Sequence, residues 1–267
     1  MVVFILGINS DIGTALAQRY RAQGYTVIGT YRNKNHLNTL LTQPGIRLLH
    51  CDIAKKSSVR KCLDKFRKLA QKWDIFISCA GTLEPIGSFF DCDFNRWEES
   101  ITVNAISQLR FLHGMHSFRR KGRLCQVVFL AGGGTNSPLT NYSAYCTAKI
   151  MLIKMCELLD DENRDLNVFI IGPGWVRTKI HNQTLKSRLR SGKNYDRALK
   201  FLRSDNPGTP YQDIYDCIHW CIRQGRQAAG GRNFSVVYDR WRNKGLSLAR
   251  QLRADTNKFK LRRFKNK

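Results

Sequence analysis

The chain has 267 residues, of which 42% are hydrophobic, and its 45 Lys and Arg against 20 Asp and Glu give a formal net charge of +25. This length suits one α/β domain or two small ones, and the apolar share is sufficient for a real core. The positive charge indicates a polyanionic neighbour, such as nucleic acid, an anionic membrane surface or a phosphorylated substrate, or else a basic surface with no specific partner.

Nine cysteines are scattered through apolar stretches and form no Cys-x-x-Cys pair. Neither a zinc site nor a thioredoxin-like motif is therefore indicated, no metal is expected, and the free thiols fit a reducing cytosol. The apolar run at residues 1–7 is too short for a signal peptide and lacks a basic start. No run approaches the roughly 18 apolar residues of a membrane span, so we expect a soluble, cytoplasmic protein.

The first 31 residues have the pattern of a βαβ unit. Val2 to Leu6 is a continuous apolar run that predicts a strand buried on both faces. A turn from Gly7 to Gly13 leads into a helix over residues 14–23, and a second strand is predicted from Thr26 to Tyr31. Such a turn lets the backbone approach a pyrophosphate, which the N-terminus of the helix also attracts.

The residues after the second strand favour NADP over NAD. An acidic residue at this point would hold the ribose 2′-hydroxyl of NAD, but the chain instead has Arg32 and Lys34. Their charges suit a 2′-phosphate. The alternative is that both are ordinary surface charges.

The rest of the chain continues the alternation of strands and helices. We therefore predict an α/β protein with a three-layer, doubly wound Rossmann fold and a mainly parallel sheet of about seven strands. Residues 1–240 form a single dinucleotide-binding domain in this prediction, and residues 241–267 form a basic C-terminal tail. The further predicted strands are residues 46–50, 74–79, 124–130, 167–171 and 234–238, and the further helices are residues 54–72, 95–119 and one that ends near residue 159.

Tyr145 and Lys149 have the spacing that places two side chains on one face of a helix, one turn apart. A lysine ammonium beside a phenol favours the phenolate and is expected to lower the tyrosine pKa, which would make the pair a proton donor and acceptor near neutral pH. The spacing alone also fits a half-buried ring beside a solvated lysine.

From Val2 to Tyr238 the chain resembles the short-chain dehydrogenase/reductase family. Six elements occur in the order that the family has them, although each is weak by itself. They are Gly7-x-x-x-x-Ile12-Gly13, Asp52-Ile53, Cys79-Ala80-Gly81, Asn104, Tyr145 with Lys149, and Pro173-Gly174-Trp175-Val176-Arg177-Thr178.

The resemblance implies an NADPH-dependent carbonyl reductase or alcohol dehydrogenase. Tyr145 would exchange a proton with the substrate oxygen, Lys149 would lower the tyrosine pKa and hold the nicotinamide ribose, and Asn104 would support a water that links Lys149 to solvent. The family also implies a homodimer or homotetramer. The implied cofactor-binding residues are Gly7, Asn9, Ser10, Asp11, Ile12, Gly13, Arg32, Asp52, Ile53, Ala80, Gly81, Tyr145, Lys149, Pro173, Gly174, Val176 and Thr178.

Three positions depart from the family pattern. Asp11 replaces the middle glycine of the cofactor loop, Cys79 replaces an asparagine, and Gly132 stands where a serine normally binds the substrate carbonyl. Three hypotheses address the missing serine: a loop hydroxyl such as Thr135 takes its place, backbone N–H groups of residues 132–134 polarise the carbonyl, or the protein binds the cofactor with little turnover. The predicted substrate contacts are Gly132, Gly133, Thr135 and Trp175.

The segment after Thr178 is expected to fold over the substrate as a lid. Its repeated Lys and Arg residues up to Lys200 favour an anionic substrate, such as a sugar phosphate, a nucleotide sugar or an acyl-carrier conjugate, or else form a solvated helix face. His181 is a candidate substrate contact or a structural residue. Trp175 either lines the pocket or packs under the lid.

The predicted tail contains ten Lys or Arg residues interleaved with Phe and Leu. This pattern fits an anionic membrane surface or nucleic acid, and equally a solvated tail or one that packs on a neighbouring subunit. The lead hypothesis is a carbonyl reductase that acts on a small anionic or sugar-derived substrate. The alternative is a catalytically weak dinucleotide-binding protein that uses its basic surface and tail to bind nucleic acid or a membrane.

Overall fold

The computed structural model describes residues 1–34, 37, 40 and 43–263, and within them seven parallel strands form one sheet. The strand order is β3-β2-β1-β4-β5-β6-β7, which confirms the doubly wound Rossmann fold. The strands are β1 (Val2–Leu6), β2 (Thr26–Tyr31), β3 (Ile46–His50), β4 (Ile75–Ser78), β5 (Cys125–Leu130), β6 (Leu166–Gly172) and β7 (Asn233–Ser235).

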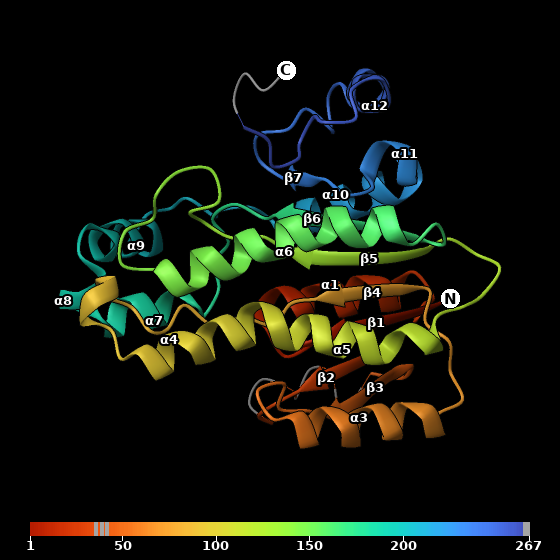
Figure 1. Ribbon diagram of the computed structural model, residues 1–267, viewed down its shortest axis with the longest axis horizontal. Helices are drawn as coiled ribbons and strands as arrows, with labels where there is room; N and C mark the ends of the chain where they lie inside the picture. Colours follow the sequence, from red (N-terminus) through yellow and green to blue (C-terminus); the bar gives the residue numbers. More distant parts are fainter. Residues whose placement is uncertain (35–36, 38–39, 41–42, 264–267) are drawn as a thin grey trace.

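Helices cover both faces of this sheet (Figure 1). The helices of the two layers and of the lid are α1 (Asp11–Ala22), α3 (Lys56–Lys68), α4 (Phe94–Ile101), α5 (Ser107–Met115), α6 (Ser143–Glu162), α7 (His181–Lys186), α8 (Arg188–Ser191), α9 (Lys193–Arg203), α10 (Tyr211–Gln224), α11 (Arg226–Ala229) and α12 (Gly245–Ala254).

The alternation of side chains along each strand builds two separate cores. In β1, Val3 and Ile5 face the core beneath α1 and α10, whereas Phe4 and Leu6 face the core beneath α3, α5 and α6. Phe4 is fully buried, and its ring stacks on that of Phe76 with 5.8 Å between the centroids. Burial on both faces explains why these strands read as unbroken apolar runs.

The order of the strands reverses between β1 and β4. The chain leaves β1 and β4 toward opposite faces of the sheet. A crevice therefore opens beyond the carboxyl ends of these two strands, where Leu6 lies beside Ser78. The short helices α7, α8 and α9 gather beyond the same edge (Figure 1). The fold therefore brings the predicted cofactor turn and the predicted lid to one place.

The single long helix predicted over residues 95–119 is interrupted. Between α4 and α5 lies a turn of π-helix, η2 (Thr102–Ile106), and a 3-10 turn, η3 (His116–Phe118), follows α5. A π turn inserts one extra residue and redirects side chains, and such turns recur at functional sites. Asn104 lies in the middle of this one.

Two other predicted elements are shorter than expected. The helix predicted over residues 54–72 spans only α3, and Ala70 beyond it has a φ of 51°, which a right-handed helix does not adopt. The strand predicted over residues 234–238 ends at Ser235, whose N–H donates to Asp239 Oδ2 at 2.7 Å. This bond turns the chain away from the sheet.

The predicted tail packs on the domain over its described part. Trp241, Leu248 and Leu252 belong to the same core as β1 and α10. Arg232 is 3% exposed and donates to the carbonyls of Leu252 and Asp255, which fixes the end of α12. The ring of Phe259 packs edge-on against that of Phe234, with 5.6 Å between the ring centres. This aromatic residue of the tail therefore packs against the domain. Residues 264–267 lie outside the described residues.

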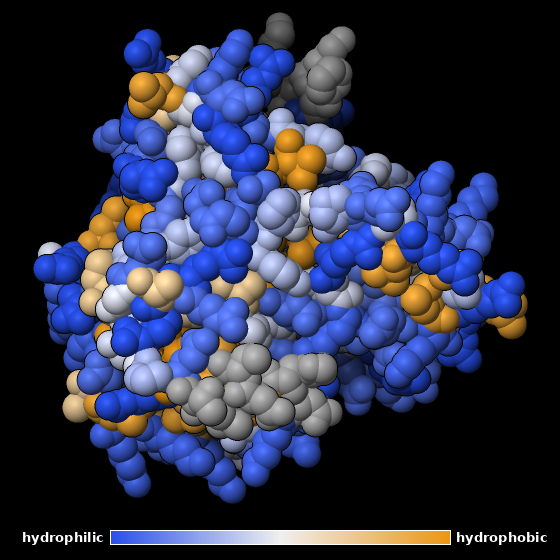
Figure 2. Space-filling model, turned by 180° about the vertical axis from the view of Figure 1, so that it is seen from behind, coloured by the Kyte–Doolittle hydropathy of each residue, from blue (hydrophilic) through white to orange (hydrophobic). Residues whose placement is uncertain are grey.

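The surface seen from behind is mainly hydrophilic, with hydrophobic residues in small separate groups (Figure 2). Across the described residues, no helix combines the length and the apolar character that a membrane crossing requires.

The contact of Glu157 with the tail makes a prediction about stability. Arg262 binds Glu157 Oε1 at 2.5 Å and Oε2 at 3.1 Å, Lys154 binds Oε2 at 2.9 Å, and together they hold the pKa of Glu157 at about 2. Because this pKa is lower in the folded state, the stabilisation is complete above the ordinary pKa of the carboxyl and is lost as the pH falls toward 2. We expect Glu157→Gln to lower the free energy of unfolding by about 1 kcal/mol at pH 7.

Urea unfolding at pH 7 and at pH 3 measures this effect. Glu162→Gln removes an exposed carboxylate from the end of the same helix and is the matched control. The ion pair would not stabilise the fold if the two variants lost the same amount at pH 7, or if the loss in Glu157→Gln did not shrink at pH 3.

Candidate active site

The turns that follow β1 and β4 meet at the reversal point. Gly7 has a φ of +79°, and a Cβ at this position would lie 3.1 Å from the backbone nitrogen of Ala80. Ser10 caps α1, because its Oγ accepts a hydrogen bond from the N–H of Gly13 at 3.0 Å. A Cβ at Gly13 would lie 2.5 Å from the Gly7 carbonyl oxygen, so only glycine permits the turn to be this tight. The predicted cofactor turn thus lies against Ala80.

Asp11, which replaces the family's glycine, contacts the lid. It is the first residue of α1, and its Oδ2 accepts the backbone N–H of Lys179 at 2.7 Å. The ammonium of Lys179 donates to the Asn9 carbonyl at 2.6 Å. Ile12 packs against the core beneath α1. The departure at Asp11 therefore fastens the cofactor turn to the lid.

A cavity of about 440 Å³ lies beyond the ends of β2 and β3, and two of the predicted cofactor-binding residues, Arg32 and Asp52, line it. Ile53 instead packs against the core on the side of α3. Sequence reasoning missed Lys55 and Lys61 here, because they approach Arg32 only through the pairing of β2 with β3. The lining residues are Arg32, Asn33, His50, Asp52, Lys55, Ser57, Ser58 and Lys61.

The structure brings the three predicted catalytic residues together. Tyr145 and Lys149 are 8% and 4% exposed on the buried face of α6, and Lys149 Nζ lies 5.6 Å from the centre of the tyrosine ring. Lys149 also donates to the carbonyl of Leu130 at 2.9 Å. A Cβ at Gly81 would lie 3.2 Å from Asn104 Oδ1 and 3.9 Å from Lys149 Nζ, so this glycine makes room for both.

Asn104 is fully buried, and both the nitrogen and the oxygen of its side-chain amide form hydrogen bonds. Its Nδ2 donates to the carbonyl of Thr82 at 2.9 Å, and its Oδ1 accepts the N–H of Thr82 at 2.9 Å. Gln108, also fully buried, donates to the carbonyls of Asn104 at 2.7 Å and Ala80 at 3.0 Å. Sequence reasoning missed Gln108. Its only signal is a polar residue four positions after Asn104 on the buried side of the helix.

The pKa of Tyr145 differs from the sequence expectation. Burial raises the tyrosine pKa above its ordinary value, and burial lowers the pKa of Lys149 to about 8. The expected depression of the tyrosine pKa is absent here because burial penalises the charged phenolate most strongly, while the Lys149 ammonium lies 5.6 Å from the ring centre and is bonded to the Leu130 carbonyl.

The tyrosine side chain packs against the Cα of Gly132. A Cβ at Gly132 would lie 2.5 Å from the Cζ of Tyr145 and closer still to its hydroxyl. A serine at this position and the present tyrosine rotamer therefore exclude each other. Thr135, the hydroxyl proposed as a substitute, donates to the Gly132 carbonyl at 3.3 Å within its own loop. At the neighbouring Gly133, an added Cβ would contact only Leu139, at 3.4 Å.

The segment from Pro173 to Thr178 leads from β6 into the lid. Gly174 has a φ of +77°, and Val176 is buried and pairs with Gly208. Trp175 is 47% exposed and stacks on His181 with 5.3 Å between ring centres and 4° between planes. Since His181 Nε2 lies 2.9 Å from the Val176 carbonyl, the histidine has a structural contact. One face of the tryptophan is covered, and the side chain remains partly open to solvent.

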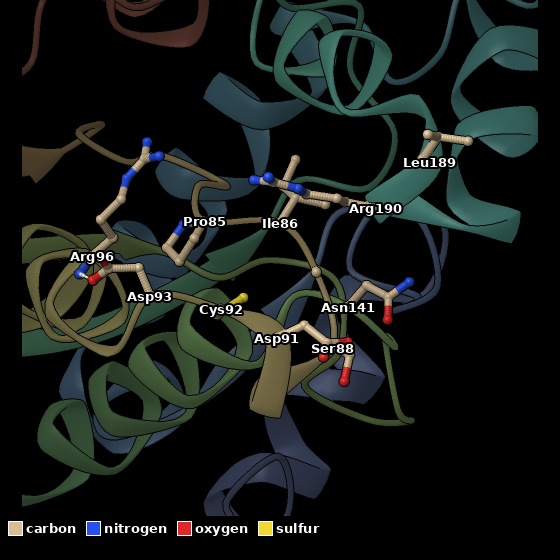
Figure 3. A pocket seen from close by; sticks show the side chains of 11 residues that line it. Pro85, Ile86, Ser88, Asp91, Cys92, Asp93, Arg96, Asn141, Leu189 and Arg190 are labelled. Atoms are coloured by element: carbon tan, nitrogen blue, oxygen red, sulfur yellow. Dashed lines mark hydrogen bonds between the residues drawn. The ribbon is translucent and has the colours of Figure 1, made fainter.

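The lid is tied to the walls of the crevice as well. Gln183 Oε1 accepts the N–H of Leu83 at 2.6 Å, and the hydroxyls of Thr184 and Tyr142 lie 2.9 Å apart. Ile86 packs with Tyr142 and Tyr145 and also lines a cavity of about 300 Å³ (Figure 3). That cavity is lined by Pro85, Ile86, Gly87, Ser88, Asp91, Cys92, Asp93, Arg96, Asn141, Leu189 and Arg190.

A doubly wound parallel sheet with a glycine turn at its reversal point, beside a tyrosine and lysine on one helix, is typical of dinucleotide-dependent oxidoreductases. The family described as Enoyl-(Acyl carrier protein) reductase matches residues 7–203. The chain belongs to the short-chain dehydrogenase/reductase family and is an NAD(P)-dependent enzyme of that family.

Relatives with similar sequences are oxidoreductases. An uncharacterized oxidoreductase of Schizosaccharomyces pombe is 26% identical over 223 residues, which cover 80% of this chain and 87% of the relative. Serine 3-dehydrogenase of Rhizobium radiobacter is 26% identical over 232 residues, which cover 83% of this chain and 88% of that enzyme.

Solved structures share the fold. A short-chain dehydrogenase/reductase of Saccharomyces cerevisiae superposes with a TM-score of 0.78 at 19% identity, covering 90% of this chain and 96% of that one. A short-chain dehydrogenase of Shigella flexneri, solved with NADP, has a TM-score of 0.73 at 19% identity and covers 88% and 96%. A 4-hydroxyisoleucine dehydrogenase mutant, solved with NADH and succinate, has a TM-score of 0.71 at 20% identity and covers 88% and 96%.

The contact between Gly132 and Tyr145 predicts that restoring the family's serine is harmful. In Gly132→Ser the new side chain collides with the tyrosine ring, and we expect the free energy of unfolding to fall by about 1–3 kcal/mol. Gly133→Ser is the matched control, since its added Cβ meets only Leu139. Thermal unfolding of both variants tests the prediction, which is wrong if Gly132→Ser is as stable as Gly133→Ser.

Proposed function

We propose that this enzyme uses NADPH to reduce the carbonyl group of a small anionic substrate. The observation that carries the proposal is the convergence of Tyr145, Lys149 and Asn104 beside the glycine turn at the carboxyl edge of the sheet. In this proposal Tyr145 and Lys149 are catalytic, and Asn104 holds the loop after β4 through both of its hydrogen bonds with Thr82.

The proton chemistry follows from burial. The nicotinamide, when bound, supplies a hydride to the carbonyl carbon. Tyr145 gives its phenolic proton to the carbonyl oxygen, and its raised pKa keeps that proton on the phenol at neutral pH. Lys149, with a pKa of about 8, carries a positive charge at pH 7 and stabilises the phenolate that remains. This assignment favours reduction as the direction of the reaction.

Backbone groups are the best candidates to polarise the carbonyl in place of the missing serine. Among the described residues, the N–H groups of Gly132, Gly133 and Gly134 donate to no protein acceptor. Because the Thr135 hydroxyl is bonded within its own loop, the hypothesis of an N–H donor is better supported than that of a substitute hydroxyl.

The charge around the cavity beyond β2 and β3 supports the preference for NADPH. Arg32, Lys55 and Lys61 contribute three positive charges against the single negative charge of Asp52. The hydroxyls of Ser57 and Ser58 line the same cavity. This combination suits the 2′-phosphate of NADP better than the neutral hydroxyl of NAD.

The cavity beside Ile86 supports an anionic substrate. The guanidinium groups of Arg96 and Arg190 both border it, from α4 and from α8 (Figure 3). Arg96 pairs with Glu84 at 3.4 Å, whereas Arg190 forms no ion pair with any other described residue. Ile86 lines this cavity and also packs with Tyr145, so the cavity that Arg190 borders adjoins the proposed catalytic centre. Sugar-derived and carboxylate-bearing carbonyl compounds both fit, and serine and 4-hydroxyisoleucine, after which two similar enzymes are named, carry a carboxylate.

Exposed aromatic side chains support a homo-oligomer. Phe90, in the 3-10 turn η1 (Phe89–Asp91), is 92% exposed, and Phe94, the first residue of α4, is 56% exposed. Helix α4 packs beside α6. The proposed dimer or tetramer would cover both aromatic side chains. The alternative of a tail that binds nucleic acid or a membrane loses support, because Phe259 and Leu261 pack on the domain.

Replacing the tyrosine hydroxyl tests the catalytic assignment. In Tyr145→Phe the proton donor is absent, so we expect kcat to fall by at least about a hundredfold. The affinity for NADPH should stay within about threefold. Loss of nicotinamide absorbance with a panel of ketones measures turnover, and fluorescence titration measures binding. Unchanged turnover in Tyr145→Phe would refute the role of this residue.

Replacing Arg32 tests the choice of cofactor. We expect Arg32→Ala to raise the KM for NADPH by about tenfold or more, because it removes a charged partner of the 2′-phosphate, and to change the KM for NADH less than about threefold. Lys34→Ala is the matched control, since Lys34 lies two residues away and does not line the cavity. Equal losses for the two cofactors would contradict the proposed preference.

A further inference from the structure

Two bonds at Lys179 join the first residue of the lid to the cofactor turn. The backbone N–H of Lys179 donates to Asp11 Oδ2 at 2.7 Å, and its ammonium donates to the Asn9 carbonyl at 2.6 Å. The two partners lie on either side of Ser10, the capping residue of α1. We call these contacts between Lys179, Asn9 and Asp11 the clasp.

The clasp connects the two ends of the proposed cofactor site. Asn9 Nδ2 donates to the Asn33 carbonyl at 3.1 Å, and Asn33 and Arg32 line the cavity proposed for the 2′-phosphate. On its other side, the lid continues into α7, where Gln183 binds the N–H of Leu83 at the wall of the crevice. The lid is therefore held to the cofactor turn on one side and to the substrate side on the other.

The clasp lies at the N-terminus of α1, where Ser10 is the capping residue and Asp11 is the first helical residue. The N-terminus of α1 behind the glycine turn is the part of this fold that attracts a diphosphate. Asp11 adds a negative charge at this end, which disfavours a diphosphate, and Lys179 adds a positive charge, which favours it. Within the described residues, the Lys179 ammonium has only a neutral carbonyl as its partner. A diphosphate is a stronger acceptor for an ammonium than a neutral carbonyl is.

We propose that Lys179 is the lid's binding residue for the cofactor diphosphate, and that Asp11 keeps the lid in place while Lys179 exchanges its partner. On binding, the ammonium leaves the Asn9 carbonyl for the diphosphate, and the N–H of Lys179 stays on Asp11. The lid is thereby coupled to the presence of the cofactor. Asp11 also repels the diphosphate, which limits the affinity and assists release. This inference rests on the proposed use of NADPH.

The 2′-phosphate and the diphosphate contribute separately to cofactor affinity, and both contributions can be measured without turnover. NADPH carries both the 2′-phosphate and the diphosphate, whereas adenosine 2′-monophosphate carries only the first. Lys179→Met removes the ammonium but keeps the backbone N–H that Asp11 binds. We expect this variant to bind NADPH about tenfold more weakly and to bind adenosine 2′-monophosphate as the wild type does.

Lys186→Met is the matched control, because Lys186 is an exposed lysine at the end of α7 and the variant loses the same charge. Titration by fluorescence or calorimetry gives both dissociation constants. The proposal is overturned if Lys179→Met and Lys186→Met bind NADPH equally well, or if Lys179→Met weakens both ligands alike. A wild-type protein that does not bind NADPH would instead refute the proposed cofactor.

Asp11→Asn tests the second half of the clasp. The amide oxygen of asparagine can still accept the N–H of Lys179, but the negative charge is gone. We expect NADPH to bind about threefold to tenfold more tightly, mainly through slower dissociation in stopped-flow measurements, with adenosine 2′-monophosphate unchanged. Asp161→Asn, which removes an exposed carboxylate on α6 that does not line the cofactor cavity, is the control for a general loss of negative charge. An unchanged or weaker affinity of Asp11→Asn for NADPH would contradict the role of Asp11.

Discussion

The contact between the turns after β1 and β4 is the constraint on which the site depends. Gly7 approaches the backbone of Ala80 so closely that an added Cβ would lie 3.1 Å from its nitrogen. This approach is imposed by the parallel pairing of the two strands, which also brings their carboxyl ends level, with Leu6 beside Ser78. Everything that follows Ala80, including the loop at Thr82 that Asn104 holds, takes its position from this contact.

Buried polar groups are concentrated at this edge of the sheet. Asn104, Gln108 and Lys149 are almost fully enclosed, and burying such groups is costly unless each finds a partner. Backbone carbonyls at the ends of β4 and β5 supply those partners, so the network is satisfied by the same strands that form the crevice. Burial still destabilises the charged form of Lys149 and lowers its pKa. The protonation of Lys149 is therefore sensitive to groups that bind near it.

Part of the positive charge serves the structure itself. Arg232 holds the end of α12 through carbonyl groups, and Arg177 binds the carbonyls of Phe201 and Leu202 at the end of α9. A guanidinium suits this use because its several N–H groups can satisfy several unpaired carbonyls at a helix C-terminus. The net charge of +25 alone is therefore weak evidence for a polyanionic partner. The arginines and lysines that border cavities, such as Arg190 and Lys61, are the informative ones.

The sequence by itself determined the order of strands and helices and the parallel sheet, because unbroken apolar runs and glycine turns act locally. The class of enzyme came from the six motifs that resemble the short-chain dehydrogenase/reductase family. The sequence also predicted Tyr145, Lys149 and Asn104 as catalytic residues, and the structure brings Lys149 and Asn104 together at Gly81, with Tyr145 one turn from Lys149 on α6. Only the tertiary structure decided what the departures mean. Gly132 gives room to the tyrosine ring, Asp11 binds a lid residue 168 positions away, and Gln108 links two turns. These contacts join segments that are distant along the chain, and no local pattern of residues encodes which distant backbone group a buried side chain will meet.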